Sequence, residues 1–237
     1  MQSDFWGAFY HSDLQSLWLL LVVPSLFLLF LLTRGRPAAP PRARFLYTWA
    51  LLFTLETMLD PIATGPLLRV LKLDGVALYA WIFVFVWLGD FRVLWLHFAD
   101  GGDAPHPRAA ARPAAALACL VPLATGALYA PVWMGFVEAP SQVLWLIYET
   151  LFFALALWLR GRTANPALRA IWLYVLAYYG LWIAADVLIL SGVDPGWALR
   201  VVPNQLYYAF FVPFVWWRAR GSSREVEAGI SGRARPA

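Results

Sequence analysis

The sequence predicts an all-α fold, a bundle of about seven helices that cross a membrane. Three observations support this fold class. Hydrophobic residues make up 62% of the 237 residues and charged residues only 14%, whereas a soluble domain typically carries about 25% charged residues. Apolar runs of about 20 residues, the length that crosses the hydrocarbon core, recur along the chain. Basic residues gather in alternate links between these runs, which is typical of polytopic membrane proteins.

Each apolar run is long enough to be a membrane-spanning helix, and the Pro- and Gly-containing links between the runs are short. The predicted seven-helix domain occupies residues 1–220, and we expect residues 221–237 to form a polar, disordered cytoplasmic tail. The predicted helices are Leu14–Thr33, Phe45–Leu68, Gly75–Phe98, Pro113–Met134, Ser141–Leu159, Leu168–Leu190 and Ala198–Trp217.

The distribution of positive charge predicts the orientation of the bundle. The links after the first, third and fifth predicted helices, together with the tail, hold fourteen of the 18 Lys and Arg residues. The opposite side holds only Arg69, Lys72 and Arg200, and Arg92 lies inside a predicted helix. Because cytoplasmic loops are enriched in Lys and Arg, we expect the N-terminus outside and the C-terminus in the cytoplasm. The Ala- and Arg-rich loops favour a bacterial protein of the inner membrane. The acidic N-terminal region is unlike the basic start of a cleavable signal peptide, so we expect the first helix to remain in the protein.

Polar side chains inside the predicted helices are the candidate functional residues, because a charge in the bilayer core costs about 3 kcal/mol. We expect such side chains to face a protein interior or a wet cavity rather than lipid. The candidate catalytic residues are Glu56, Asp60, Asp90 and Glu149. The candidate substrate-binding residues are Arg92, Trp87, Trp145, Tyr148, Asp186, Asn204, Gln205 and Tyr208, with Trp49 and Trp182 as further aromatic neighbours.

Glu56 and Asp60 are four residues apart, so they share one helix face. Two carboxyl groups on one face of low dielectric resist ionising together, and at least one is expected to hold a proton at neutral pH. A neutral carboxylic acid can act as an acid catalyst or as a proton carrier. The alternative is that each buried acid only bonds to neighbouring helices and holds the bundle together.

Two basic residues of the third predicted helix allow more than one interpretation. Arg92 lies near the cytoplasmic end, so it can extend to the interface or pair with an acid of the second helix. His97 is interpreted as an interfacial residue.

Prolines predict irregular backbone at two places. The segment Pro61, Thr64, Gly65 and Pro66 should kink or end the second helix, and its freed carbonyl groups would lie beside the acids. Pro203 is interpreted as a residue of the first turn of the seventh helix.

Several cofactor classes are not expected. Lys72 is the only lysine, so no Schiff base to retinal can form in the seventh helix. The chain has three histidines and one cysteine, Cys119, which is interpreted as a small apolar residue. Haem ligation and zinc sites are therefore not predicted, and no metal or other cofactor is assigned. Nucleic acid is not an expected partner, because the basic residues lie in the links and set the orientation of the helices in the membrane. The expected partners are the lipid bilayer and either a lipophilic molecule or a cation.

Three function classes fit these features. In the first, a buried acid protonates an alkene or epoxide, and aromatic faces stabilise the resulting carbocation. In the second, the acids give a cavity a negative field that suits transport of protons, cations or a cationic solute. In the third, the bundle is a sensor, a receptor or an assembly partner.

A family resemblance favours the first class. The chain length, the basic link after the first helix, Glu56 within Thr48–Asp60, and the basic turn Arg160-Gly161-Arg162 resemble the small seven-helix membrane-bound terpenoid cyclases. The resemblance spans the chain as an architecture and implies acid catalysis on a terpenoid-like substrate, with Glu56 as a site residue. It departs in the last helix, where those cyclases use an aspartate and this chain has Asn204 and Gln205.

Overall fold

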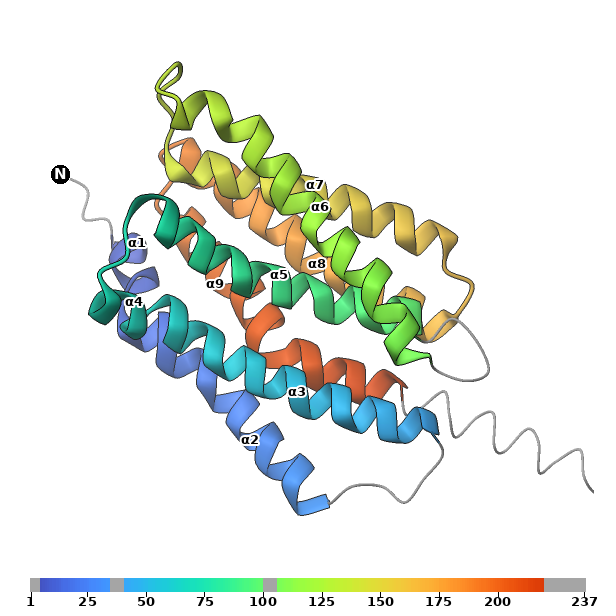
Figure 1. The fold of residues 1–237 in the computed structure, drawn as a ribbon. Helices are drawn as coiled ribbons and strands as arrows, with labels where there is room; N and C mark the ends of the chain where they lie inside the picture. Colours follow the sequence, from blue (N-terminus) through green and yellow to red (C-terminus); the bar gives the residue numbers. More distant parts are fainter. Residues whose placement is uncertain (1–4, 35–40, 100–105, 220–237) are drawn as a thin grey trace, which may run out of the picture.

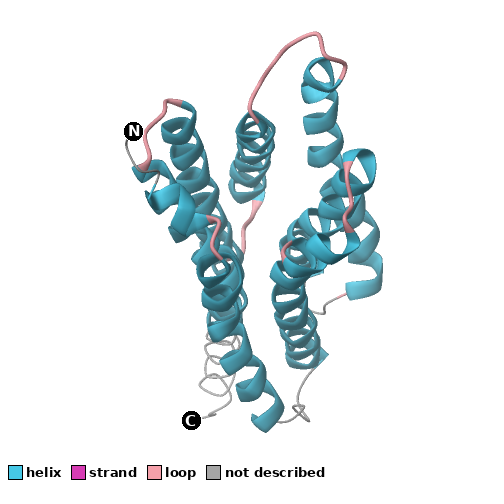
Figure 2. Ribbon diagram, turned by 90° about the vertical axis from the view of Figure 1, so that its left-hand side faces the viewer, coloured by secondary structure: helices cyan, strands magenta, loops and turns pink. Residues whose placement is uncertain are grey.

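The computed structural model describes residues 5–34, 41–99 and 106–219, and all regular structure in these ranges is helical. Figure 1 shows long helices running side by side, and Figure 2 shows the same bundle turned by 90°. The predicted tail lies outside the described residues. The elements are α1 (Phe5–Tyr10), the π-helix η1 (Leu14–Trp18), α2 (Leu19–Arg34), α3 (Pro41–Thr64), α4 (Pro66–Leu71), α5 (Gly75–Ala99), α6 (Pro107–Trp133), α7 (Ser141–Arg162), α8 (Pro166–Leu190), α9 (Pro195–Asn204) and the π-helix η2 (Gln205–Phe210), followed by a helical segment over 211–219.

Five of the described helices are long and apolar enough to cross a membrane, judged by length and composition. They are Leu14–Arg34, Ala77–Ala99, Pro107–Trp133, Ser141–Arg162 and Pro166–Leu190. The helix α3 and the final helix from Pro195 run beside them in Figure 1. The count of seven spans and the orientation of the termini therefore remain predictions.

The predicted break in the second helix is present. The helix α3 ends at Thr64, and α4 begins at Pro66. Gly65 joins them with φ −108° and ψ −99°, and a Cβ atom there would lie 2.7 Å from the Pro61 carbonyl oxygen. Because proline lacks an N–H group and this turn leaves no room for a side chain, the helix ends between Thr64 and Pro66.

Three helices begin earlier than predicted, and each of them begins at a proline. The helix α3 begins at Pro41, α6 begins at Pro107, and α9 begins at Pro195, each before the predicted start. Proline suits the first turn of a helix, where its missing N–H group would have no partner. The assignment of Pro203 to the first turn is wrong, because this residue lies inside the final helix, immediately before Asn204 and the π-helix η2.

The π-helix η2 is tied to its neighbours through backbone carbonyl groups. The guanidinium group of Arg92 donates to the Tyr207 carbonyl at 2.9 Å, and the Tyr174 hydroxyl donates to the Leu206 carbonyl at 3.0 Å. A π-helix offsets the regular hydrogen-bonding pattern of the helix, and such segments are frequent at functional sites. Side chains from α5 and α8 thus anchor the irregular part of the final helix.

The apolar core lies where α3, α5, α7, α8 and the final helix meet. Its fully buried members include Trp49, Phe53, Phe152, Trp172 and Phe211. On the outside of the bundle, large apolar side chains remain exposed, such as Leu26 at 63% and Leu123 at 64%. A surface of this kind is expected of helices that face lipid, because hydrocarbon rather than water then surrounds them.

Candidate functional site

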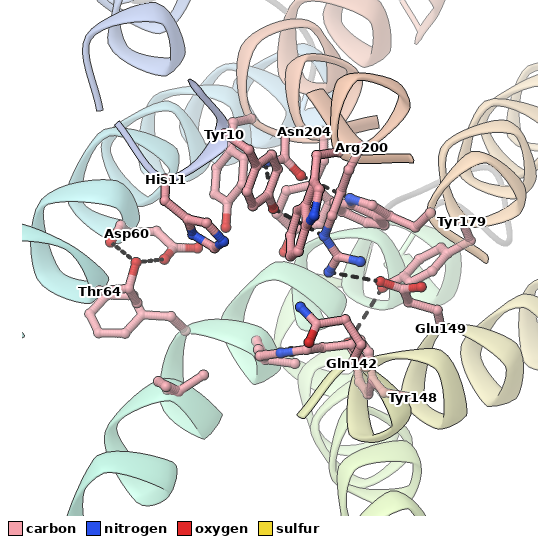
Figure 3. Close-up of a pocket in the computed structure, with 18 residues that line it drawn as sticks. Tyr10, His11, Asp60, Thr64, Gln142, Tyr148, Glu149, Tyr179, Arg200 and Asn204 are labelled. Carbon is pink, nitrogen blue, oxygen red and sulfur yellow. Dashed lines mark hydrogen bonds and ion pairs between the residues drawn. The ribbon is translucent and has the colours of Figure 1, made fainter. Parts of the chain in front are cut away.

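One end of the bundle contains a cavity of about 410 Å³, shown in Figure 3. This end carries α1, the link between α8 and α9, and the first turns of α5 and α7. Apolar and aromatic walls combine with a set of polar groups, as is typical of small-molecule sites. The lining residues are Tyr10, His11, Asp60, Thr64, Ile82, Phe85, Val86, Gln142, Trp145, Tyr148, Glu149, Tyr179, Trp182, Trp197, Arg200, Asn204, Tyr207 and Tyr208.

Asp60 lies on the wall of this cavity, one turn before the break that ends α3. The Thr64 hydroxyl donates to Asp60 Oδ1 at 3.2 Å and approaches the Asp60 carbonyl oxygen at 2.8 Å. The residue is 3% exposed. Within the described part of the chain, no basic side chain forms an ion pair with Asp60. Asp60 is therefore a cavity-lining acid whose charge no arginine offsets by direct contact.

Arg200 organises the opposite wall. Its Nη2 atom lies 3.3 Å from Glu149 Oε1 on α7, and Nη1 is paired with Asp186 on α8. Its Nε atom donates to the Tyr10 hydroxyl at 3.0 Å. This single guanidinium group thus connects α9, α7, α8 and α1. Glu149 lines the cavity, and its buried Oε2 atom has no hydrogen-bond partner among the described residues.

The sequence assigned Arg200 to the outer side with Arg69 and Lys72, and it did not single out this residue as part of a site. The residue is only 7% exposed and lies in the second turn of a helix that begins at Pro195. The available signal was its position inside the predicted helix Ala198–Trp217, where an arginine must find a buried partner or reach water. The described part of the bundle therefore contains two buried arginines, Arg92 and Arg200.

Asp90 is held behind the cavity by two tyrosines that line it. The Tyr148 hydroxyl donates to Asp90 Oδ2, and the Tyr179 hydroxyl donates to Oδ1 at 2.8 Å. Asp90 is 2% exposed and does not itself line the cavity. Both carboxylate oxygens are thus satisfied, and Asp90 fixes the position of the two rings.

Arg92 is fully buried and pairs with Glu56 of α3, with 3.5 Å between Nη1 and Oε2. The guanidinium carbon also lies 4.1 Å from the centre of the Tyr207 ring and 4.6 Å from that of Phe211. Of the two interpretations given above, pairing with an acid of the second helix is the one observed. Extension to the interface is wrong, because the final helix covers the side chain and supplies its remaining contacts.

The structure separates the predicted site residues into two groups. The cavity brings together Asp60, Glu149, Trp145, Tyr148, Asn204 and Tyr208, together with Trp182. The residues Glu56, Asp90, Arg92, Trp87, Asp186, Gln205 and Trp49 do not line it. Most of the second group are engaged in contacts between helices, which matches the structural alternative weighed for buried acids.

Two tryptophans illustrate why the second group lies elsewhere. Trp87 points toward α6, where its indole N–H donates to the Ala115 carbonyl at 3.3 Å. Trp49 is buried in the core and donates to the Arg92 carbonyl at 3.0 Å. His97, near the end of α5, is half-buried and accepts a hydrogen bond from the Trp172 indole at 3.2 Å.

The N-terminal segment contributes site residues that the sequence analysis missed. The α1 helix packs against α9, and its Trp6 and Gly7 N–H groups each donate to the Asp194 carboxylate at 3.1 Å. This contact brings Tyr10 to Arg200 and to Asn204, whose Nδ2 lies 3.2 Å from the Tyr10 hydroxyl. The aromatic composition of residues 5–10 was the available signal, but the segment is too short to stand out as a helix.

Asn204 forms hydrogen bonds with two other residues that line the cavity. Its Oδ1 accepts from the Trp182 indole at 2.8 Å, while its amide nitrogen faces Tyr10. Two acids, Asp60 and Glu149, and two basic residues, His11 and Arg200, line this space. The described residues contain no group of three His, Cys, Asp or Glu side chains arranged to hold a metal ion. The site can therefore supply a carboxylic acid, a carboxylate fixed by arginine, and several aromatic faces.

Comparison with protein families, with curated proteins and with solved structures finds no match to this chain. The function must therefore be argued from the cavity itself. The resemblance to the terpenoid cyclases stays a hypothesis based on architecture.

Proposed function

We propose that this protein spans the bacterial inner membrane seven times, with its N-terminus outside, and that its cavity performs acid catalysis on a lipophilic, terpenoid-like substrate. The observation that carries the proposal is the position of Asp60. This acid lies on an aromatic-lined cavity, its Oδ1 accepts from Thr64, and no arginine is in contact with it. A carboxylic acid that stays protonated in a water-poor site is a suitable proton donor.

The proposed step transfers the Asp60 proton to one carbon of a substrate alkene. A C–H bond forms there, the π bond breaks, and the adjacent carbon becomes a cation. The faces of Trp145, Trp182 and Tyr208 are available to stabilise this cation. Loss of a proton from a neighbouring carbon to the Asp60 carboxylate restores the acid. The overall reaction is then an isomerisation or cyclisation that conserves the composition of the substrate.

The other acids have supporting roles in this proposal. Glu149 is paired with Arg200, so in its ionised form it can stabilise positive charge in the cavity without donating a proton. Asp90 positions Tyr148 and Tyr179. Glu56 offsets the charge of the buried Arg92 and does not touch the substrate.

Deuterium incorporation tests the proposal directly. The purified protein in lipid nanodiscs is incubated in D₂O with isoprenoid alkenes and epoxides, and products are analysed by mass spectrometry. We expect deuterated products, and we expect Asp60→Asn to lower turnover by about 100-fold or more, the usual contribution of a general acid. Asp74→Asn, an exposed acid outside the cavity, is the matched control and should retain turnover. Full activity of Asp60→Asn would contradict the assignment.

A second candidate, cation- or proton-coupled transport, is favoured by a different observation. Two irregular helix segments adjoin the cavity: Thr64 ends α3 at its break, and Tyr207 and Tyr208 belong to the π-helix η2. Interrupted helices beside a binding site are typical of secondary transporters. In liposomes that contain a pH-sensitive dye, proton flux that Asp60→Asn abolishes, with no turnover of any lipophile, would favour transport over catalysis.

A further inference from the structure

A second cavity, of about 340 Å³, lies beside the first. The two cavities share Tyr10, His11, Thr64, Asn204 and Tyr208 as lining residues. The two cavities therefore meet at side chains from α1 and its following turn, α3, and the final helix.

Gln15 is the unusual residue of this second cavity. It is 0% exposed, yet neither its Oε1 nor its Nε2 atom has a hydrogen-bond partner among the described residues. A buried amide without partners is destabilising, and such groups are rare in folded proteins. Gln15 is one of the residues that line this cavity, so a molecule bound there lies next to the side chain whose hydrogen bonds are unmade.

The neighbours of Gln15 indicate an uncharged polar partner. Arg69 lines the same cavity but is exposed and pairs with Asp13 at 2.9 Å. Ser16 donates its hydroxyl to the Ser12 carbonyl at 2.8 Å, so it is already engaged. An amide offers one acceptor and two donors, which matches a hydroxyl, carbonyl or amide group better than an ion.

The surroundings also indicate a lipophilic molecule. Leu20, Pro61 and Leu68 form apolar walls of the second cavity. Gln15 itself belongs to the first candidate membrane-crossing segment, Leu14–Arg34, and lies on the π-helix η1. A neutral polar group attached to an apolar chain suits both the walls and this position near the end of the segment.

We propose that the second cavity is a subsite in which Gln15 binds the neutral polar end, such as a hydroxyl group, of a lipophilic molecule whose apolar part occupies the first cavity. This inference rests on the proposed function, since it names the substrate class of the same site. Its test measures binding and not turnover, so it can fail independently of acid catalysis.

Photolabelling in phosphatidylcholine nanodiscs tests the subsite. The probe is a twelve-carbon primary alcohol that carries a diazirine on its chain, and the competitors are 1-dodecanol and dodecane. We expect labelled peptides from the segments around 10–20 and 60–69, which line the second cavity, and around 82–86, 142–149, 179–182 and 197–208, which line the first. We also expect 1-dodecanol to compete at a mole fraction at least tenfold below that of dodecane, because the site hydrogen-bonds a hydroxyl group.

Gln15→Met, which keeps the side-chain length but removes the amide, should abolish this tenfold preference and leave dodecane competition unchanged. Ser16→Ala is the matched control and should retain the preference, because the Ser16 hydroxyl already bonds to the Ser12 carbonyl. Preserved alcohol preference in Gln15→Met, or labelling of the parent protein outside these segments, would overturn the proposal. If Gln15→Met does not fold, the competition and the labelled peptides of the parent protein still decide the question. A site filled only by water predicts equal competition by 1-dodecanol and dodecane.

Discussion

The Tyr207 hydroxyl lies so close to Gly89 that a Cβ atom on Gly89 would overlap it. Gly89 is on α5 and Tyr207 is on the π-helix η2, so this contact sets the distance between the two elements. The same tyrosine lines the cavity and packs against Arg92. Packing therefore explains the glycine in the middle of this apolar helix, because any side chain at position 89 would collide with Tyr207.

Gly89→Ala should destabilise the protein, although alanine normally stabilises a helix interior by about 1 kcal/mol relative to glycine. The added methyl group must displace the Tyr207 ring, and overpacking of this kind costs about 1–3 kcal/mol. Thermal unfolding in detergent measures the effect. Gly180→Ala is the matched control, since its nearest neighbour, Phe153 Cε2, lies at an ordinary 3.5 Å and no clash results. Equal Tm changes in both variants would refute the packing argument.

Removal of Arg92 should destabilise the bundle by about 3–5 kcal/mol, because it leaves the Glu56 carboxylate buried without its partner. Replacing both residues, as in Arg92→Met with Glu56→Met, should recover much of this loss. A double-mutant cycle on the free energy of unfolding measures the coupling. Strictly additive changes would show that the two side chains do not interact.

Asp194→Ala should loosen the N-terminal segment. The Asp194 carboxylate caps the N–H groups of Trp6 and Gly7, and loss of such a cap costs about 1 kcal/mol. We expect faster hydrogen exchange and faster proteolysis in residues 5–11, with the rest of the bundle unaffected. Asp74→Ala, which alters an exposed acid elsewhere, serves as the reference. Unchanged exchange at Trp6 and Gly7 would argue against the cap.

His11 should make docking of the N-terminal segment sensitive to pH. Burial, and secondly the positive charge of Arg200, lower the pKa of His11 from its usual value of 6.5. The undocked segment then binds protons more readily than the docked one, so docking weakens as the pH falls below about 6.5. Since His11 remains partly exposed, the change should be modest.

Proteolysis rates of the N-terminal segment between pH 7.5 and pH 5 measure this effect. His11→Gln should reduce the dependence on pH. Asp60, Glu149 and Arg200 line the same cavity, so the difference between parent and variant, rather than either profile alone, reports on His11. Identical profiles would exclude His11 as the sensitive group.

Much of the helical architecture was predictable from the sequence. The runs of apolar residues located the five candidate membrane-crossing helices to within a few residues, apart from the earlier start of α6 at Pro107. The segment from Pro61 to Pro66 predicted the end of α3 correctly. These features depend on residues close together in the chain, where hydropathy and backbone geometry act locally.

The tertiary structure decided which polar residues share a space. Asp60, Glu149 and Asn204 come together at the cavity, whereas Glu56 and Asp90 are taken up by Arg92 and by two tyrosines. Helical periodicity assigns a residue to a face, but it does not specify which partner from another helix meets that face.

The sequence by itself determined a helical, apolar chain with acids inside its helices, because composition and local spacing are sufficient for that. Only the packing of distant segments brought Arg200 to Glu149 and Asp186, and Tyr10 to Asn204. Buried charged and polar groups must find partners across helices, since neither the hydrocarbon nor their own helix can satisfy them. That requirement, rather than sequence spacing, left Asp60 as the acid that faces the cavity without an arginine.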